Sequence, residues 1–208
     1  MSARICVIDY GMGNLRSVEK AFEHVGATAT IANDAATVRA ADGLVLPGVG
    51  AFPRAMERIG PLGIDELIAE QRDAGVPILG ICLGLQLLFD SSTELGGAEG
   101  LGLLPGGVTE LQADGLKIPH IGWAPLRWER ESRLAEGIPT ETPFYFVHSF
   151  APSPEPGELL GSAEYGSRFA CAAERDNVFG VQFHPEKSSA AGLRRLANCA
   201  GVCVSVPA

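Results

Sequence analysis

The sequence lacks the features of several protein classes. Its longest uncharged run, residues 74–89, is too short to span a bilayer and contains a proline and three glycines. The net charge of −9 leaves no basic excess for nucleic-acid binding. The five cysteines are odd in number and form no C-x-x-C pair, which argues against a disulfide framework or a zinc site. The chain enters strand-like residues at once, without a signal peptide, so we expect a cytoplasmic protein.

What is present is an ordinary globular composition. The 208 residues are 46% apolar and 20% charged, which predicts a single domain over residues 1–208 with a substantial core. Strand-like runs alternate with helical patterns up to residue 90, which is typical of a parallel, doubly wound sheet. The expected strands are 5–9, 28–31, 44–46 and 76–81, and the expected helices are 15–25, with Asn14 as a side-chain cap, and 64–71.

After residue 90 glycine and proline are frequent and helical periodicity fades. Short strands are expected at 108–111, 144–150, 159–165 and 178–183, and a last helix at 193–200; Pro152, Pro154 and Pro156 indicate a loop. The predicted fold class is therefore α/β: a doubly wound, mostly parallel central sheet with helices on both faces and additional antiparallel strands in the C-terminal half.

Residues 76–89, VPILGICLGLQLLF, predict a buried strand, a sharp turn and a helix. Cys82 lies at the turn between Gly80 and Gly84, which is the G-x-nucleophile-x-G pattern of a nucleophile elbow. A tight strand-to-helix turn leaves little room for a Cβ two residues away on either side. The start of a helix also favours a thiolate. The same residues could form a core strand with a buried free cysteine, so the elbow requires a base nearby.

A candidate base lies in the FHPE segment at residues 183–186. Pro185 keeps His184 extended, and alternate residues of an extended chain point to the same side. His184 and Glu186 can therefore project together, with the carboxylate holding the imidazole. Beside Cys82 they supply a nucleophile, a base and an orienting acid. Without Cys82, the better interpretation of this segment would be a surface turn with unrelated polar residues.

Two glycine-rich turns follow predicted strands. PGVG at 47–50 lies at the carboxyl end of its strand, where its glycines let backbone N–H groups approach a ligand; the alternative is a plain tight turn. GMGN at 11–14 is not a dinucleotide fingerprint, because Arg16 replaces the third glycine. His120 and His148 fit strands as core or site-wall residues. No cofactor and no metal site are predicted.

Together these motifs resemble the class I (triad-type) glutamine amidotransferases. GICLGLQ and HPE are specific to that superfamily, and DYGMGNLRS, KIPHIGW and HPEKS together resemble the glutaminase subunits of imidazole glycerol phosphate synthase. The resemblance implies a flavodoxin-like sheet and hydrolysis of L-glutamine. The matching segments, which cover nearly the whole chain in the family's order, are IDYGMGNLRS (8–17), LPGVGAF (46–52), GICLGLQLLF (80–89), KIPHIGW (117–123), FVHSF (146–150) and FHPEKS (183–188).

The resemblance also implies residue roles. Cys82 would be the nucleophile, His184 the base and Glu186 its orienting group. The oxyanion hole would use the Leu83 N–H and an N–H from Val49 or Gly50. Substrate contacts are implied for Gly48 and Gln86 and for the backbone of His148, Ser149 and Phe150. Relatives often carry tyrosine at the position of Phe150, so only the backbone contact is carried over there.

A partner is implied as well. Ammonia would pass to a separate (β/α)8-barrel cyclase subunit in a heterodimer of histidine biosynthesis, and Asn14 and Lys187 would face that partner. The PGVG turn can switch its peptide orientation, so the oxyanion hole could form only in the loaded complex. Residues 201–208 match none of these motifs.

Three alternatives stay open from sequence. The chain could be the glutaminase subunit of another amidotransferase, such as that of pyridoxal phosphate synthesis, although KIPHIGW and DYGMGN argue against it. It could be a γ-glutamyl peptidase or hydrolase on the same fold. It could also be a non-catalytic interaction subunit, which the complete Cys82, His184 and Glu186 set disfavours.

Overall fold

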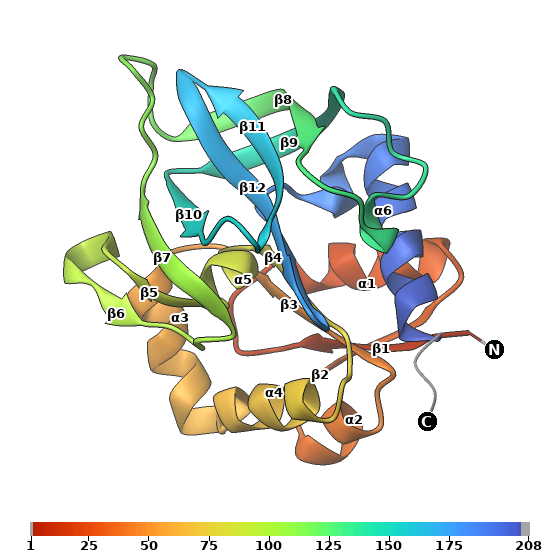
Figure 1. Cartoon of the computed structure of the whole chain (residues 1–208). Coiled ribbons are helices and arrows are strands. Elements are labelled where there is room, and N and C mark those ends of the chain that lie inside the picture. The colour runs from red at the N-terminus through yellow and green to blue at the C-terminus, as the bar shows by residue number, and fades with distance from the viewer. Residues whose placement is uncertain (1, 205–208) are drawn as a thin grey trace.

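The computed structural model describes residues 2–204 and contains two sheets (Figure 1). The large sheet has, in spatial order, β2 (Thr28–Ala32), β1 (Arg4–Ile8), β3 (Gly43–Gly48), β4 (Ile78–Cys82), β13 (Val178–Val181), β12 (Ser167–Arg175), β11 (Leu159–Tyr165), β8 (His120–Trp128) and β9 (Thr142–His148). The small sheet has the order β10 (Phe150–Pro154), β7 (Leu104–Glu110), β5 (Phe89–Ser92) and β6 (Ala98–Glu99).

The large sheet changes character at β13. The five strands from β2 to β13 are mutually parallel, whereas β12, β11, β8 and β9 pair in antiparallel fashion. The order 2-1-3-4 followed by β13 is that of a flavodoxin-like sheet. The predicted fold class, a doubly wound parallel sheet with antiparallel strands added by the C-terminal half, is confirmed.

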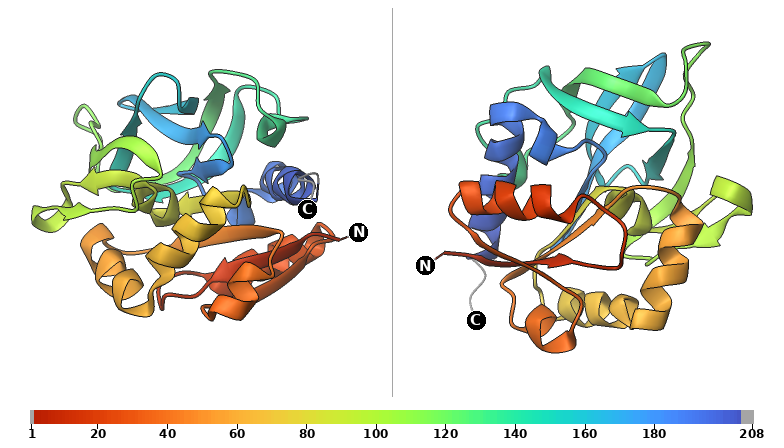
Figure 2. Two further views of the ribbon diagram at one scale, coloured as in Figure 1. Left: turned by 60° about the horizontal axis from the view of Figure 1, so that its bottom comes forward. Right: turned by 180° about the vertical axis from the view of Figure 1, so that it is seen from behind.

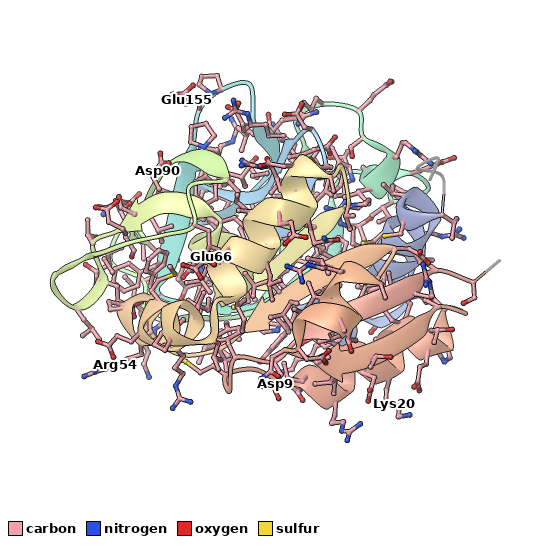
Figure 3. All side chains as sticks on the ribbon, turned by 90° about the horizontal axis from the view of Figure 1, so that it is seen from below. Asp9, Lys20, Arg54, Glu66, Asp90 and Glu155 are labelled. Atoms are coloured by element: carbon pink, nitrogen blue, oxygen red, sulfur yellow. The ribbon has the colours of Figure 1, made fainter. Side chains whose placement is uncertain are left out.

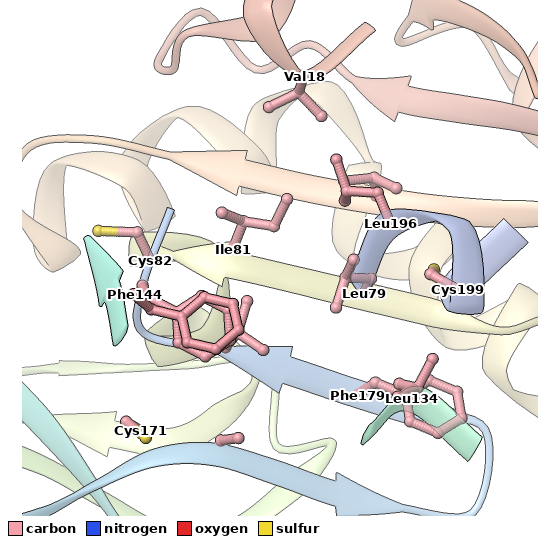
Figure 4. Packing of buried hydrophobic residues seen from close by; sticks show 14 of the residues in the cluster. Val18, Leu79, Ile81, Cys82, Leu134, Phe144, Cys171, Phe179, Leu196 and Cys199 are labelled. Carbon is pink, nitrogen blue, oxygen red and sulfur yellow. The ribbon is translucent and has the colours of Figure 1, made fainter. Parts of the chain in front are cut away.

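Helices bury both faces of the parallel half, as the views in Figure 2 show. They are α1 (Leu15–His24), α2 (Ala35–Arg39), α3 (Phe52–Ile59), α4 (Ile64–Asp73), α5 (Leu83–Leu87) and α6 (Ser189–Cys203). On one face Leu79 and Ile81 of β4 belong to a cluster that includes Val18 of α1 and Leu196 of α6 (Figure 4). The opposite face packs against α2, α3, α4 and α5. Burial on both faces explains why β1, β3 and β4 are continuous apolar runs rather than alternating ones.

Charged side chains project from the outer faces of the helices. Figure 3 shows the labelled side chains of Lys20, Arg54 and Glu66 projecting from α1, α3 and α4, and all three residues are exposed. Across residues 2–204, each helix is too short or too polar to span a bilayer.

Several boundaries differ from the sequence-based expectation. The expected strand 144–150 is two strands, β9 and β10, which separate at Ser149 and enter different sheets. Pro152 and Pro154 lie within β10 rather than in a loop. β10 is the outermost strand of the small sheet, where a missing N–H can be tolerated. Strands β5, β6 and β12 and helices α2 and α3 were not expected, and β8 contains His120, which was expected in a strand whose bounds were not predicted.

The expectations for the first and the last helix also required correction. Asn14 precedes α1, but its side chain makes no cap hydrogen bond; only its backbone oxygen accepts, from the Val18 N–H at 3.3 Å. The last helix is longer than expected, because α6 runs from Ser189 to Cys203. Of the unmatched tail 201–208, the first three residues complete α6, and 205–208 lie outside the described residues.

Candidate active site

Cys82 is the last residue of β4 and directly precedes α5, at the carboxyl edge of the parallel sheet (Figure 4). Its backbone has φ 55° and ψ −112°, an unfavourable region for a residue with a Cβ. A Cβ on Gly80 would lie 2.6 Å from the Gly84 oxygen, and one on Gly84 would overlap the Leu46 carbonyl oxygen. Both glycines are therefore required by close backbone approach, and the predicted strand–turn–helix elbow is confirmed.

The His184–Glu186 pair lies beside the elbow because β13 runs parallel to β4, with Val181 opposite Ile81. His184 has an extended backbone, and its N–H donates to the Tyr145 oxygen at 2.9 Å. Its Nδ1 lies 2.8 Å from Glu186 Oε1, and both side chains are almost fully buried. Glu186 lies in a 3-10 turn (Pro185–Lys187), so the alternation of an extended chain was the wrong reason for a contact that does form.

The electrostatics of the pair favour a charged imidazole. Burial by itself would lower the pKa of His184, but hydrogen bonding and charge from Cys82 and Glu186 outweigh it and raise the pKa to about 10. With Nδ1 engaged by Glu186, Nε2 is left without a hydrogen-bond partner of regular geometry. That nitrogen is the one available to exchange a proton with the Cys82 sulfur.

A pocket of about 280 Å³ opens over Cys82. It contains eight of the residues that the sequence singled out, from three separate segments of the chain, together with Glu94, Pro119 and Val147. The sequence-derived lining residues are Val49, Gly50, Cys82, Leu83, Gln86, His148, Ser149 and Phe150. The structure thus brings the expected nucleophile, oxyanion and substrate residues to one cavity.

Three other predicted residues lie elsewhere. Gly48 is buried and does not line the pocket. It packs closely against its neighbours, because a Cβ on Gly48 would overlap the Tyr10 hydroxyl and lie 3.0 Å from the Leu83 Cβ. Asn14 and Lys187 are exposed and do not line the pocket. Gly50 has φ 107°, a conformation that glycine tolerates readily, and with Val49 it faces solvent.

His148 lines the pocket, and His120 packs against it. His148 Nδ1 donates to the Phe150 oxygen at 2.9 Å, which leaves Nε2 to accept from His120 Nδ1 at 3.3 Å. Burial lowers the pKa of His148 to about 4, so the ring is neutral. This agrees with the expectation of a core or site-wall role. Within residues 2–204 no cluster of three or more histidine, cysteine or acidic side chains is arranged to hold a metal ion.

Two site residues were missed. The Glu94 carboxylate accepts the Phe52 N–H at 2.8 Å and lines the pocket from the loop between β5 and β6. Gln182 is fully buried, and its amide nitrogen lies 3.7 Å from the Cys82 sulfur. Nothing in the local pattern distinguishes Glu94 from a surface acid. Gln182 stands two residues before His184, and that proximity was the one available signal.

Comparison with known proteins agrees with this geometry. The family model for glutamine amidotransferase class-I matches residues 6–200. Imidazole glycerol phosphate synthase subunit HisH of Moorella thermoacetica is 51% identical over 195 residues, covering 93% of this chain and 92% of that protein. The HisH subunit of Bacillus cereus is 46% identical over 198 residues, covering 95% and 94%.

Solved structures show the same fold at lower identity. A chain in the structure of PurLQS from Thermotoga maritima has a TM-score of 0.76 at 20% identity, covering 99% of this chain and 100% of that one. A putative GMP synthase subunit from Thermoplasma acidophilum has a TM-score of 0.74 at 21% identity, covering 99% and 96%. The chain belongs to the class I glutamine amidotransferases and, within them, to the family of imidazole glycerol phosphate synthase HisH subunits.

Proposed function

We propose that this chain hydrolyses L-glutamine through Cys82, His184 and Glu186 and passes the ammonia to a separate cyclase subunit. The observation that carries the proposal is the position of Cys82: an elbow cysteine opens into a pocket of about 280 Å³, next to a buried His184–Glu186 pair. A histidine held by a carboxylate is the arrangement that activates a nucleophile.

The reaction starts with the Cys82 proton already transferred to His184, and the Cys82 sulfur attacks the side-chain amide carbon of glutamine. The resulting oxyanion is received by the Leu83 N–H and by an N–H of the 49–50 turn, both of which border the pocket. Loss of one such donor costs roughly a hundred- to a thousandfold in rate. His184 then protonates the leaving ammonia, and water hydrolyses the thioester to release glutamate.

The pocket wall supplies complementary groups for the amino-acid end of the substrate. Glu94 provides a negative charge for an α-ammonium group, and its other contact, with the Phe52 N–H, holds it in place. Gln86 donates its Nε2 to the Phe150 oxygen, which leaves Oε1 free to accept from the substrate. The backbone around Ser149 completes this end of the pocket.

The partner would bind over the pocket mouth. We define the rim patch as Ile121, Trp123, Tyr145 and Val147, which lie on the adjacent strands β8 and β9. Ile121 is 62% and Trp123 is 52% exposed, and the Trp123 and Tyr145 rings are 5.9 Å apart. Exposed apolar side chains next to a reactive site indicate a protein interface. A cyclase seated there, with Asn14 and Lys187 at its edge, would receive ammonia without losing it to solvent.

The test compares glutamine hydrolysis by the chain alone, with a (β/α)8-barrel cyclase, and with the cyclase plus its phosphoribosyl ligand. We expect ammonia release to rise in the loaded complex, because the exposed 49–50 turn can then adopt the oxyanion-binding orientation. Equal rates in all three samples would exclude gating, and no hydrolysis in any sample would exclude the proposed function.

A Cys82→Ala complex supplied with ammonium salt is the matched control. It should still form the cyclase product, because only the glutaminase step has been removed. Cleavage of γ-glutamyl peptides in place of glutamine would instead favour a hydrolase on the same fold.

A further inference from the structure

Gln182 is a buried polar residue that the mechanism above does not use. It follows β13 directly, its side chain has no solvent exposure, and its backbone N–H donates to the Cys171 oxygen at 2.8 Å. Burying a side-chain amide costs folding free energy unless its N–H donors and its carbonyl oxygen form hydrogen bonds. Its partners therefore indicate what it does.

The orientation of the Gln182 amide follows from a chain of hydrogen bonds. The Phe150 carbonyl oxygen can only accept, so the Gln86 atom 3.0 Å from it is the nitrogen Nε2. The same Nε2 lies 3.0 Å from Gln182, which must therefore present its oxygen, Oε1. The Gln182 nitrogen then points the other way, toward the Cys82 sulfur at 3.7 Å.

Two properties of the site follow. The sulfur of Cys82 receives an N–H donor from Gln182, on top of its contact with the Val147 oxygen at 3.8 Å. A donor stabilises negative charge on sulfur, whereas a carbonyl oxygen does not. In addition, Gln182 and Phe150 together occupy Gln86 Nε2, so Gln86 can present only its oxygen to the pocket.

We propose that Gln182 is a positioning residue for glutamine hydrolysis: its amide N–H holds the Cys82 sulfur in its reactive, negatively charged form, while its carbonyl oxygen fixes the orientation of the substrate-facing Gln86. The inference takes its substrate, glutamine, from the proposed function, whereas the hydrogen-bond geometry of Gln182 does not depend on that function. One side chain thus couples the nucleophile to the substrate pocket through a chain of hydrogen bonds.

The charges that face the sulfur are few. His184, held by Glu186, faces it from the end of β13, and Tyr10 approaches from the end of β1. Burial raises the pKa of Tyr10 above its usual range, so the phenol is neutral, and the neutral His148 lines the same pocket. Glu94 is the one acidic side chain in that lining. Among the described residues, Gln182 is the side chain whose N–H lies within hydrogen-bond distance of the sulfur.

The test uses two substitutions that remove different hydrogen-bonding groups of Gln182. Gln182→Glu keeps an oxygen for Gln86 but removes the donor to the sulfur, whereas Gln182→Met removes both. Gln71→Met is the matched control, because Gln71 is also a buried glutamine but lies on α4 outside the pocket lining. Circular dichroism and urea unfolding show which variants keep the fold.

The first readout is the rate of Cys82 alkylation by iodoacetamide as a function of pH, with Cys82→Ala as the blank. The other four cysteines are buried and do not line this pocket. A hydrogen bond to a charged acceptor changes an equilibrium by roughly tenfold or more, so the pH midpoint should rise by about one unit in both Gln182 variants. The Gln71→Met profile should match the wild type.

The second readout is glutamine hydrolysis in the cyclase complex. We expect Gln182→Glu to lower kcat by roughly tenfold or more with KM nearly unchanged, and Gln182→Met also to raise KM. A folded Gln182→Glu protein with wild-type alkylation midpoint and kcat would overturn the inference, even if Gln182→Met fails to fold. Alkylation requires neither glutamine nor the cyclase, so it decides the inference even if the proposed function fails.

Discussion

Replacing Gly84 by alanine tests the reasoning on which the elbow rests. The new Cβ would overlap the carbonyl oxygen of Leu46 and lie 2.7 Å from its carbonyl carbon. Leu46 belongs to β3, which is paired with β4 through Gly80. These are backbone atoms in the middle of the sheet, so no side-chain rotation can relieve the contact. The first turn of α5 and strand β3 must instead move apart.

The magnitude can be worked from these contacts. Overpacking of this kind costs about 1–3 kcal/mol, and each ladder hydrogen bond weakened by the separation adds about 1 kcal/mol. Alanine recovers only about 0.4–1 kcal/mol by restricting the unfolded chain. We therefore expect a net loss of about 3 kcal/mol in the free energy of unfolding, or roughly 10 °C in Tm for a chain of this length.

The assay is equilibrium urea unfolding followed by circular dichroism, with Gly201→Ala as the matched control. Gly201 lies in α6, is exposed, and would place its Cβ at least 4 Å from any neighbour. Alanine there should stabilise the protein slightly, by about 0.5 kcal/mol, because glycine is a poor helix former. Equal unfolding midpoints for Gly84→Ala and the wild type would refute the close-approach argument for the elbow.

Four further outcomes are expected. Cys82→Ala should abolish glutamine hydrolysis with the fold intact. Cys82→Gly should unfold at a higher urea concentration than Cys82→Ala, because glycine relieves backbone strain of about 1–3 kcal/mol at φ 55°. The reverse order of the two unfolding midpoints would mean that the Cys82 backbone stores no strain. Glu94→Gln should raise KM for glutamine by about tenfold in steady-state assays, with a smaller change in kcat, since it removes a charge for the α-ammonium group; an unchanged KM would place the ammonium elsewhere. The pKa of His184 is raised from 6.5 to about 10, so the stability it contributes is complete below pH 6.5 and is lost as pH rises toward 10. Glu186→Gln should therefore lower the urea midpoint most below pH 6.5 and least near pH 10, and a pH-independent difference would contradict this linkage.

The segments that form the candidate site could be predicted because each is encoded locally. Gly80, Cys82 and Gly84 form a pattern that one backbone geometry requires, and the structure shows that geometry. His184 stays extended because of the following proline, which is also a local effect. Even where the detailed reason was wrong, as for Glu186, the short sequence separation limited how far its carboxylate could lie from the imidazole.

The residues that were missed are positioned by distant contacts. Glu94 reaches the pocket because the β5–β6 loop packs against the start of α3, where it accepts the Phe52 N–H. Gln182 looks like one more residue of a buried strand until Gln86 and Cys82 are placed around it. The division of 144–150 into β9 and β10 likewise depends on which sheet each half enters. None of these outcomes leaves a periodic signal in the sequence.

The order of strands in the large sheet explains why the central part of the site could be predicted from the sequence, whereas the position of Glu94 could not. In a doubly wound parallel sheet the carboxyl ends of neighbouring strands meet at one edge. The PGVG turn, the elbow and the FHPE segment lie at the carboxyl ends of β3, β4 and β13, which are adjacent in the sheet. Predicting that sheet therefore already places the three segments together, although Gln182 at the end of β13 follows Cys82 by 100 residues. The small sheet follows no such rule, so Glu94 could be assigned to the pocket only from the structure, and His148, Ser149 and Phe150 were assigned to it from the resemblance rather than from sheet order.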